Sequence, residues 1–181
     1  AVTTAQKLGQ LQGLTHQLLE LFTLGTIADL APLVGVNRRW LKRGLKRLPK
    51  SSLAGVQALM QMVGISEEQK QLKPDDIGFK LGPRINAIGR IGDPQVIIEL
   101  LTTDDEGIAL ERAMQCEQIN RKRQELCEQI EQEAIRLVAE TPIPWQKERV
   151  LVLVHNDWHH GHEELQEVHL LTCCSQNPLK T

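Results

Sequence analysis

The chain has 181 residues, of which 41% are hydrophobic and 24% are charged, a balance typical of a globular protein with a core of ordinary size. Its longest unbroken apolar run, Val150–Val154, is far shorter than the roughly 20 residues that a membrane-spanning helix needs, so we expect no membrane contact. Aromatic residues make up only 3% and there is no tyrosine, which argues against a protein that grips single strands mainly by stacking bases on rings.

The net charge of −2 hides one strongly basic segment, residues 37–50, which holds seven Lys/Arg and no acid. The rest of the chain has 14 basic residues against 23 acidic ones. This segment is therefore a candidate for contact with a phosphate backbone, and a solvated amphipathic helix is the alternative. The candidate contact residues are Arg38, Arg39, Lys42 and Arg43.

In the first half of the chain, the spacing of apolar residues predicts mainly helices. Two short helices are expected between Thr4 and Phe22, separated near Gly13. Leu24–Leu33 is bounded by Gly and Pro and predicts a buried strand end or loop. Amphipathic helices follow over Arg38–Leu48 and Ser52–Val63.

The second half predicts both element types. Ile77, Phe79 and Leu81 alternate as in a strand, and Asp93-Pro94 begins a short helix that ends at Leu101. Thr103–Glu106 is a capping box for a helix of about 37 residues that ends near Thr141. Val150–Val154 then predicts a strand. The fold class expected is α/β, dominated by helices.

The long helix carries an apolar seam from Ala109 to Leu137 with alternating steps of four and three residues. Asn120 and Arg123 interrupt it, which indicates either a buried polar contact with a neighbouring domain or a contact with substrate. Cys116 and Cys127 fall about 16 Å apart on this rigid helix and cannot form a disulfide with each other. A reducing, cytoplasmic compartment is the simplest interpretation.

Asp29 is the only acid between Glu20 and Glu67, and it follows small apolar residues. An isolated buried carboxylate is costly, so we expect Asp29 to have either hydrogen-bond partners, as in a helix cap, or a metal ion.

A second cluster, Gly78–Arg90, combines glycines, arginines and an asparagine without any acid. Arg84 and Arg90 suit bidentate contact with phosphate, and a tight turn with solvated arginines is the alternative. In contrast, the histidines and cysteines near the C-terminus, from His155 to Cys174, have no spacing typical of a zinc site.

Several of these segments together resemble the RecJ family of single-strand-specific 5′→3′ DNA exonucleases, part of the Asp-His-His (DHH) phosphoesterase superfamily. The resemblance is carried by Leu24–Asp29, by Asn37-Arg38, by Phe79-x-x-Gly-Pro-Arg-Ile-Asn-Ala-x-Gly-Arg ending at Arg90, and by Asn120–Gln124. Their order and spacing match the family from about residue 1 to residue 161.

The resemblance implies a function for the two clusters. Asp29 would be a catalytic metal ligand for one of two Mn²⁺ or Mg²⁺ ions. Arg84, Asn86 and Arg90 would lie at the floor of a channel for single-stranded DNA, with Arg84 holding a phosphate. The intact family is expected to be monomeric.

The resemblance also predicts how the chain is divided. Residues 1–102 would be the C-terminal part of the catalytic domain, 103–141 a connecting helix and 149–161 the start of the DHH-associated domain. Residues 162–181 depart from the family pattern and are expected to be a disordered tail.

The family's other metal-binding motifs lie upstream of its Gly-Thr-Ile-Ala-Asp segment, and only 28 residues precede Asp29 here. There is no Asp-x-Asp in the chain, and Asp157–His160 has an inserted Trp and follows the motif. We therefore expect an exonuclease fragment that is inactive alone. The alternatives are a non-catalytic nucleic-acid-binding module that uses the basic helix, and a helical protein that dimerises through the apolar seam.

Overall fold

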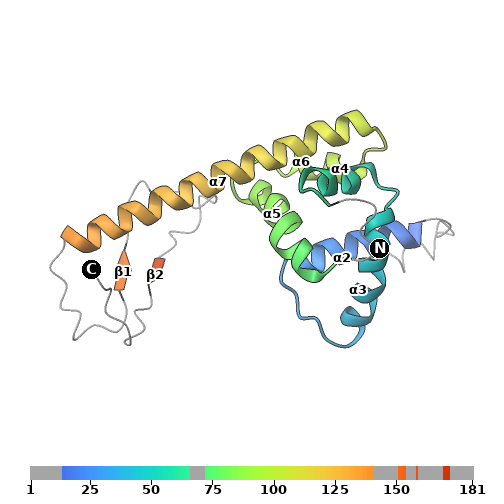
Figure 1. The fold of residues 1–181 in the computed structure, drawn as a ribbon, viewed down its shortest axis with the longest axis horizontal. Coiled ribbons are helices and arrows are strands. Elements are labelled where there is room, and N and C mark those ends of the chain that lie inside the picture. Colours follow the sequence, from blue (N-terminus) through green and yellow to red (C-terminus); the bar gives the residue numbers. More distant parts are fainter. Residues whose placement is uncertain (1–13, 66–71, 141–150, 154–157, 159–168, 172–181) are drawn as a thin grey trace. The chain divides into compact units, whose positions relative to one another are not determined.

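The computed structural model describes residues 14–65, 72–140, 151–153, 158 and 169–171 (Figure 1). Its contacts divide the chain into two units, Ala1–Arg121 and Lys122–Thr181, and the division falls inside the longest helix. The helix predicted before Gly13 and most of the His/Cys-containing C-terminal segment lie outside the described residues.

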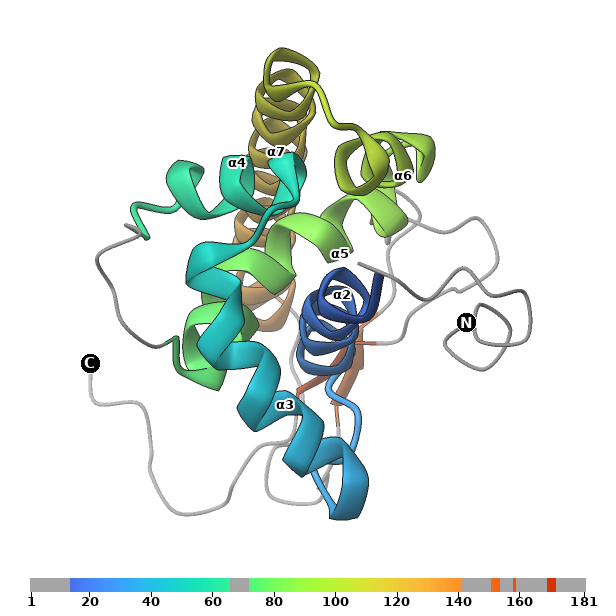
Figure 2. The same cartoon turned by 90° about the vertical axis from the view of Figure 1, so that its right-hand side faces the viewer.

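The described part of the first unit is built from helices, which pack around one core (Figures 1 and 2). The elements are α2 (Leu14–Ala28), α3 (Gly35–Arg47), the 3₁₀ turn η1 (Leu48–Lys50), α4 (Ala54–Met62), the π-helical η2 (Asp76–Leu81), α5 (Gly82–Ile91), α6 (Gln95–Thr102) and the beginning of α7 (Glu106–Glu140). Helices α3 and α5 both pack against α2, and α4 packs against α6. The largest fully buried apolar side chains include Leu48, Leu59, Met60, Leu72, Ile77, Leu81, Ile88 and Leu100.

Helix α3 confirms the predicted amphipathic pattern, since Leu41 and Leu45 are buried while all of its basic residues except the partly buried Arg47 are exposed. Gly44 is also buried and allows α3 to approach α2 closely. A Cβ atom at Gly44 would overlap Thr23 Oγ1 and lie 3.1 Å from Leu19 O. The Thr23 hydroxyl is fixed there because it donates a hydrogen bond to Leu19 O at 2.7 Å.

A buried carboxylate joins the end of α3 to α2. Glu20 is only 2% exposed, and its Oε2 accepts a hydrogen bond of 2.6 Å from Ser51 Oγ. Arg47 Nε lies 3.5 Å from Glu20 Oε1. Buried charges need such partners, so Glu20 fixes the C-terminal end of the basic helix while compensating one of its cations.

The strand predicted at Ile77–Leu81 is wrong, because these residues form the π-helical segment η2, which continues into α5. Ile77 and Leu81 are buried and Phe79 is 80% exposed. Residues four apart lie on one side of both a strand and a helix, so the alternation did not separate the two structures. Pro83 has no N–H to donate, and it lies where the π-helical bonding of η2, in which the N–H of Gly82 donates to Ile77 O, changes to the α-helical bonding of α5.

The segment Leu24–Leu33 also differs from the prediction. Its first half is the last part of α2, in which Leu24, Ile27 and Ala28 are buried as expected. The helix then ends in a Schellman-type arrangement, with the N–H of Ala31 donating to Thr26 O at 3.0 Å and that of Leu30 donating to Ile27 O at 3.1 Å. Leu30 has a φ of 52°, the left-handed conformation that this ending requires.

The predicted long helix is present as α7, with 35 residues. Its N-terminal cap is Asp105 rather than Thr103, because Asp105 Oδ1 accepts a hydrogen bond from the N–H of Ile108 at 2.9 Å. In the first unit the seam residues Ala109, Ala113 and Cys116 are fully buried. None of the described helices is both long and apolar enough to span a membrane.

In the second unit the described elements are the rest of α7 and two short strands, β1 (Leu151–Leu153) and β2 (His169–Leu171). The strands pair antiparallel, with Leu151 opposite Leu171. Strand β1 lies where a strand was predicted. Strand β2 lies within the segment expected to be disordered, so that expectation does not hold for its three residues.

The close packing at Gly44 predicts that Gly44→Ala destabilises the chain by roughly 1–3 kcal/mol, since overlap with Thr23 outweighs the better helix propensity of alanine. The matched control is Gly25→Ala in α2, where a Cβ atom meets nothing within 4 Å and a gain of roughly 0.5–1 kcal/mol is expected. Thermal unfolding followed by circular dichroism measures both. Equal stability of the two variants would contradict the packing described here.

Candidate functional site

Two of the sequence motifs meet where α2 ends and α5 begins. The side chain of Asn86 donates a hydrogen bond from Nδ2 to the carbonyl of Ala28 at 2.9 Å. At the start of α5, a Cβ atom on Gly82 would lie 3.4 Å from both Cα and Cβ of Ala28, so the backbones are in contact. The structure thereby brings Asn86 beside the residue that precedes Asp29.

Asp29 itself is exposed, which corrects the expectation of a buried carboxylate. Its apolar predecessors face the core on one side of α2, whereas Asp29 follows the last helical residue, with its N–H donating to Gly25 O at 3.0 Å. The C-terminal end of a helix already carries partial negative charge, and a carboxylate there adds to it. The position is therefore unfavourable for an isolated anion and favourable for a nearby cation.

The described residues do not complete a metal site around Asp29. Within the part of the chain that the structure describes, no three His, Cys, Asp or Glu side chains come together in a way that could hold a metal ion. Mg²⁺ prefers six ligands, and one carboxylate supplies at most two of them. These residues alone therefore do not fit a pair of divalent ions.

Arg84 is more constrained than the sequence suggested, since its side chain is 17% exposed and contacts an acid. Arg84 Nε lies 2.5 Å from Glu117 Oε2, an ion pair without the alignment of a good hydrogen bond. Arg84 Nη1 donates to the carbonyl of Lys80 at 2.5 Å. The predicted phosphate-binding residue is thus held between η2 and α7.

Glu117 was not singled out from the sequence. Its side chain is 15% exposed, and its Oε1 also accepts a hydrogen bond of 2.8 Å from Arg121 Nε. Burial acts to raise the pKa of Glu117, but the Arg121 hydrogen bond and the Arg84 charge outweigh it and lower the pKa. The i,i+4 spacing to Arg121 was readable in the sequence, whereas the contact with Arg84 depends on tertiary packing.

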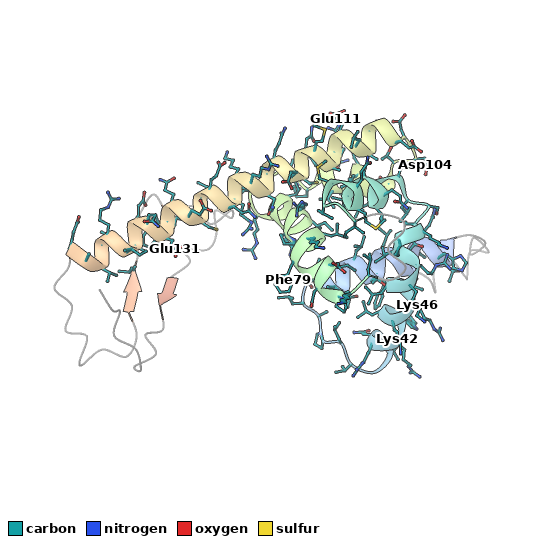
Figure 3. All side chains as sticks on the ribbon, viewed as in Figure 1. Lys42, Lys46, Phe79, Asp104, Glu111 and Glu131 are labelled. Atoms are coloured by element: carbon teal, nitrogen blue, oxygen red, sulfur yellow. The ribbon has the colours of Figure 1, made fainter. Side chains whose placement is uncertain are left out.

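The remaining predicted contacts lie on exposed surface. Arg90 is exposed in the last turn of α5 and makes no hydrogen bond or ion pair within the described part of the chain. On α3, exposed basic side chains extend into solvent, including Lys42 and Lys46 (Figure 3). The exposed basic residues of this helix are Arg38, Arg39, Lys42, Arg43 and Lys46.

The two polar residues of the long-helix seam have different environments. Asn120 is 2% exposed in the first unit. Arg123 is half-buried and lies beyond the boundary, in the second unit. A contact of these residues with a neighbouring domain stays a prediction.

No protein-family model matches the chain. Among curated proteins, it is 32% identical to the single-stranded-DNA-specific exonuclease RecJ of Bacillus subtilis over 148 residues, or 82% of this chain. The corresponding proteins of Escherichia coli and Thermus thermophilus are 32% and 39% identical over 149 and 107 residues, or 80% and 59% of this chain. The chain is similar to a segment of RecJ.

The solved structures agree with the sequence similarity to RecJ. The structure of RecJ in complex with Mn²⁺ from Thermus thermophilus matches 71% of this chain with a TM-score of 0.62 and 35% identity. The complex with Mg²⁺ from the same organism matches 77% of this chain with the same TM-score and 34% identity. These matches cover 19% and 21% of the RecJ chains.

The similarity covers only part of the curated RecJ proteins. The chain spans 18% of the length of the Bacillus protein, 25% of the Escherichia coli protein and 15% of the Thermus protein. The metals named with the solved structures are bound by those proteins.

Proposed function

We propose that the chain is a segment of a metal-dependent, single-strand-specific DNA exonuclease of the RecJ type, and that it does not cleave DNA by itself. The observation that carries the proposal is the Asn86–Ala28 hydrogen bond, which holds the Gly-Pro-Arg-Ile-Asn segment against the end of the Gly-Thr-Ile-Ala-Asp segment. These two segments carried the resemblance in the sequence, and they adjoin in space at one site. The similarity to RecJ in sequence and fold supports the same function.

In this proposal Asp29 supplies one ligand to a divalent ion, Mn²⁺ or Mg²⁺. Its exposed carboxylate at the negative end of α2 is suited to meet a cation. The related RecJ structures are solved with Mn²⁺ and with Mg²⁺. In this proposal the remaining metal ligands come from other parts of the intact enzyme. The chain alone is therefore expected to be inactive.

The same proposal assigns the grip on DNA to cationic side chains. The exposed basic face of α3 and the exposed Arg90 are free to meet phosphates, and Arg84 adds a guanidinium that is held by Glu117. Contacts of this kind are independent of base sequence and depend strongly on salt. They suit an enzyme of DNA repair and recombination that works in the cytoplasm on many sequences.

A second candidate is a non-catalytic nucleic-acid-binding module. It is favoured by the basic face of α3 and by the lack of a metal-binding cluster in the described residues. The dimerisation alternative is weaker, because the seam residues Ala109, Ala113 and Cys116 are already fully buried within the chain itself.

The first prediction for this function concerns the basic face. Replacing Arg39, Lys42 and Arg43 by Gln should weaken binding to single-stranded DNA and lower the salt slope by up to about 2, since each lost phosphate contact removes about 0.7. The matched control replaces three other exposed basic residues, Lys73, Lys122 and Arg136, by Gln. Fluorescence anisotropy at several salt concentrations measures the slope.

If both triple variants lose the same slope, net charge rather than the α3 face determines binding, and the proposed interface is wrong. Unchanged binding by the parent chain between low and physiological salt would also contradict phosphate contacts.

The second prediction concerns Asp29. The purified chain should not digest labelled single-stranded DNA with Mn²⁺ or Mg²⁺, because one carboxylate cannot fix two cations. Supplying an upstream segment with the missing Asp and His residues should restore cleavage, and Asp29→Asn in that protein should abolish it with the fold retained. The matched control is Asp75→Asn, an exposed carboxylate that forms no ion pair within the described residues, which should keep the activity.

Metal-dependent cleavage by the 181-residue chain, lost on Asp29→Asn, would show that the remaining ligands are within this chain. Full activity of the Asp29→Asn variant in the restored protein would instead remove Asp29 from the metal site.

A further inference from the structure

We propose that Glu117 is a positioning residue for Arg84, holding its guanidinium in the orientation in which it meets a DNA phosphate. The inference rests on the function proposed above, in which Arg84 contacts phosphate. Glu117 itself is not expected to touch DNA.

The first support is that the Arg84 side chain is fixed at two of its nitrogen atoms. Nε contacts the Glu117 carboxylate on α7, and Nη1 donates to the carbonyl of Lys80 in η2. Two anchors on different elements leave the guanidinium plane little freedom to rotate. An arginine that is already ordered loses less side-chain entropy when it binds a ligand.

The second support is the part of the guanidinium that remains available. Nη2 makes no hydrogen bond within the described residues. Nε is a fully buried atom without a hydrogen-bond partner, but Nη2 is not. Nη2 therefore retains contact with solvent. Nη2 is therefore the guanidinium nitrogen that is available to a phosphate oxygen.

The third support is the charge balance of the cluster. Glu117 contacts both Arg84 and Arg121, so one carboxylate compensates two cations and the group keeps a net positive charge. Because its pKa is lowered, Glu117 stays ionised at neutral pH and holds this arrangement. The residue orients Arg84 without cancelling the attraction of the cluster for phosphate.

The experiment measures binding of a labelled single-stranded oligonucleotide by the 181-residue chain at a series of salt concentrations. Glu117→Gln and Arg84→Gln should each reduce the salt slope by about 0.7, the value for one lost phosphate contact on a single strand. The double variant should show no further reduction, because Glu117 acts through Arg84. Independent effects would instead add.

The matched control is Glu111→Gln, which makes the same change of charge on an exposed side chain of the same helix, labelled in Figure 3. It should leave the slope unchanged. Circular dichroism of each variant tests whether the helices are retained, so that a loss of slope is not a loss of fold.

The outcomes separate this inference from the proposed function. If the parent chain lacks salt-dependent binding, both proposals fail. If the parent binds but Arg84→Gln keeps the parental slope, Arg84 holds no phosphate and the positioning role fails, while the α3 face and Arg90 still carry the proposed grip on DNA. If Arg84→Gln loses slope but folded Glu117→Gln does not, only the positioning role fails. Tighter binding with a steeper slope in Glu117→Gln would show that Glu117 competes with DNA, which also overturns the inference.

A second variant covers the case in which Glu117→Gln does not fold. Arg84→Lys keeps the charge but has no second nitrogen to bind phosphate while the first contacts Glu117. It should therefore recover less than half of the slope lost in Arg84→Gln. Recovery of the full parental slope would show that charge alone is needed and that no orientation by Glu117 is involved.

Discussion

The arrangement of the candidate site depends on how the end of α2 satisfies its last carbonyl groups. The final carbonyls of a helix have no partner within the helix, and the one on Ala28 receives the Asn86 amide instead. Gly82 allows this contact because it lets the start of α5 lie directly against Ala28. This one hydrogen bond joins two residues that are 58 positions apart in the sequence. It therefore sets the position of Asp29, which follows Ala28, relative to the arginine-containing segment.

Two mostly buried acids determine which cationic residues remain free. Glu20 holds Arg47 and Ser51, and thereby fixes the end of α3 on α2. Glu117 holds Arg84 and Arg121, and thereby links α5 to α7. The other basic residues of α3 face solvent, so the positive surface available to a polyanion is concentrated on this helix.

The sequence predicted the elements whose signals are local. Helices α3, α4, α6 and α7 were expected from apolar spacing, and Asp93 caps α6 as predicted, accepting a hydrogen bond from the N–H of Gln95 at 2.9 Å. The strand prediction for Ile77–Leu81 was wrong because residues four apart share a face in both a strand and a helix. The exposure of Asp29 and the Arg84–Glu117 contact could not be predicted, since both depend on how distant helices pack. The RecJ-like motifs indicated the site before its geometry was known, and the structure added that two of them adjoin.

The most direct test of this account is nuclear Overhauser spectroscopy on the isotope-labelled chain. The side-chain amide protons of Asn86 should show cross-peaks to the backbone protons of Ala28 and Asp29, because Asn86 Nδ2 lies 2.9 Å from the Ala28 carbonyl oxygen. Absence of these cross-peaks in a chain whose α2 and α5 are otherwise folded and assigned would contradict the claim that the two motifs form one site.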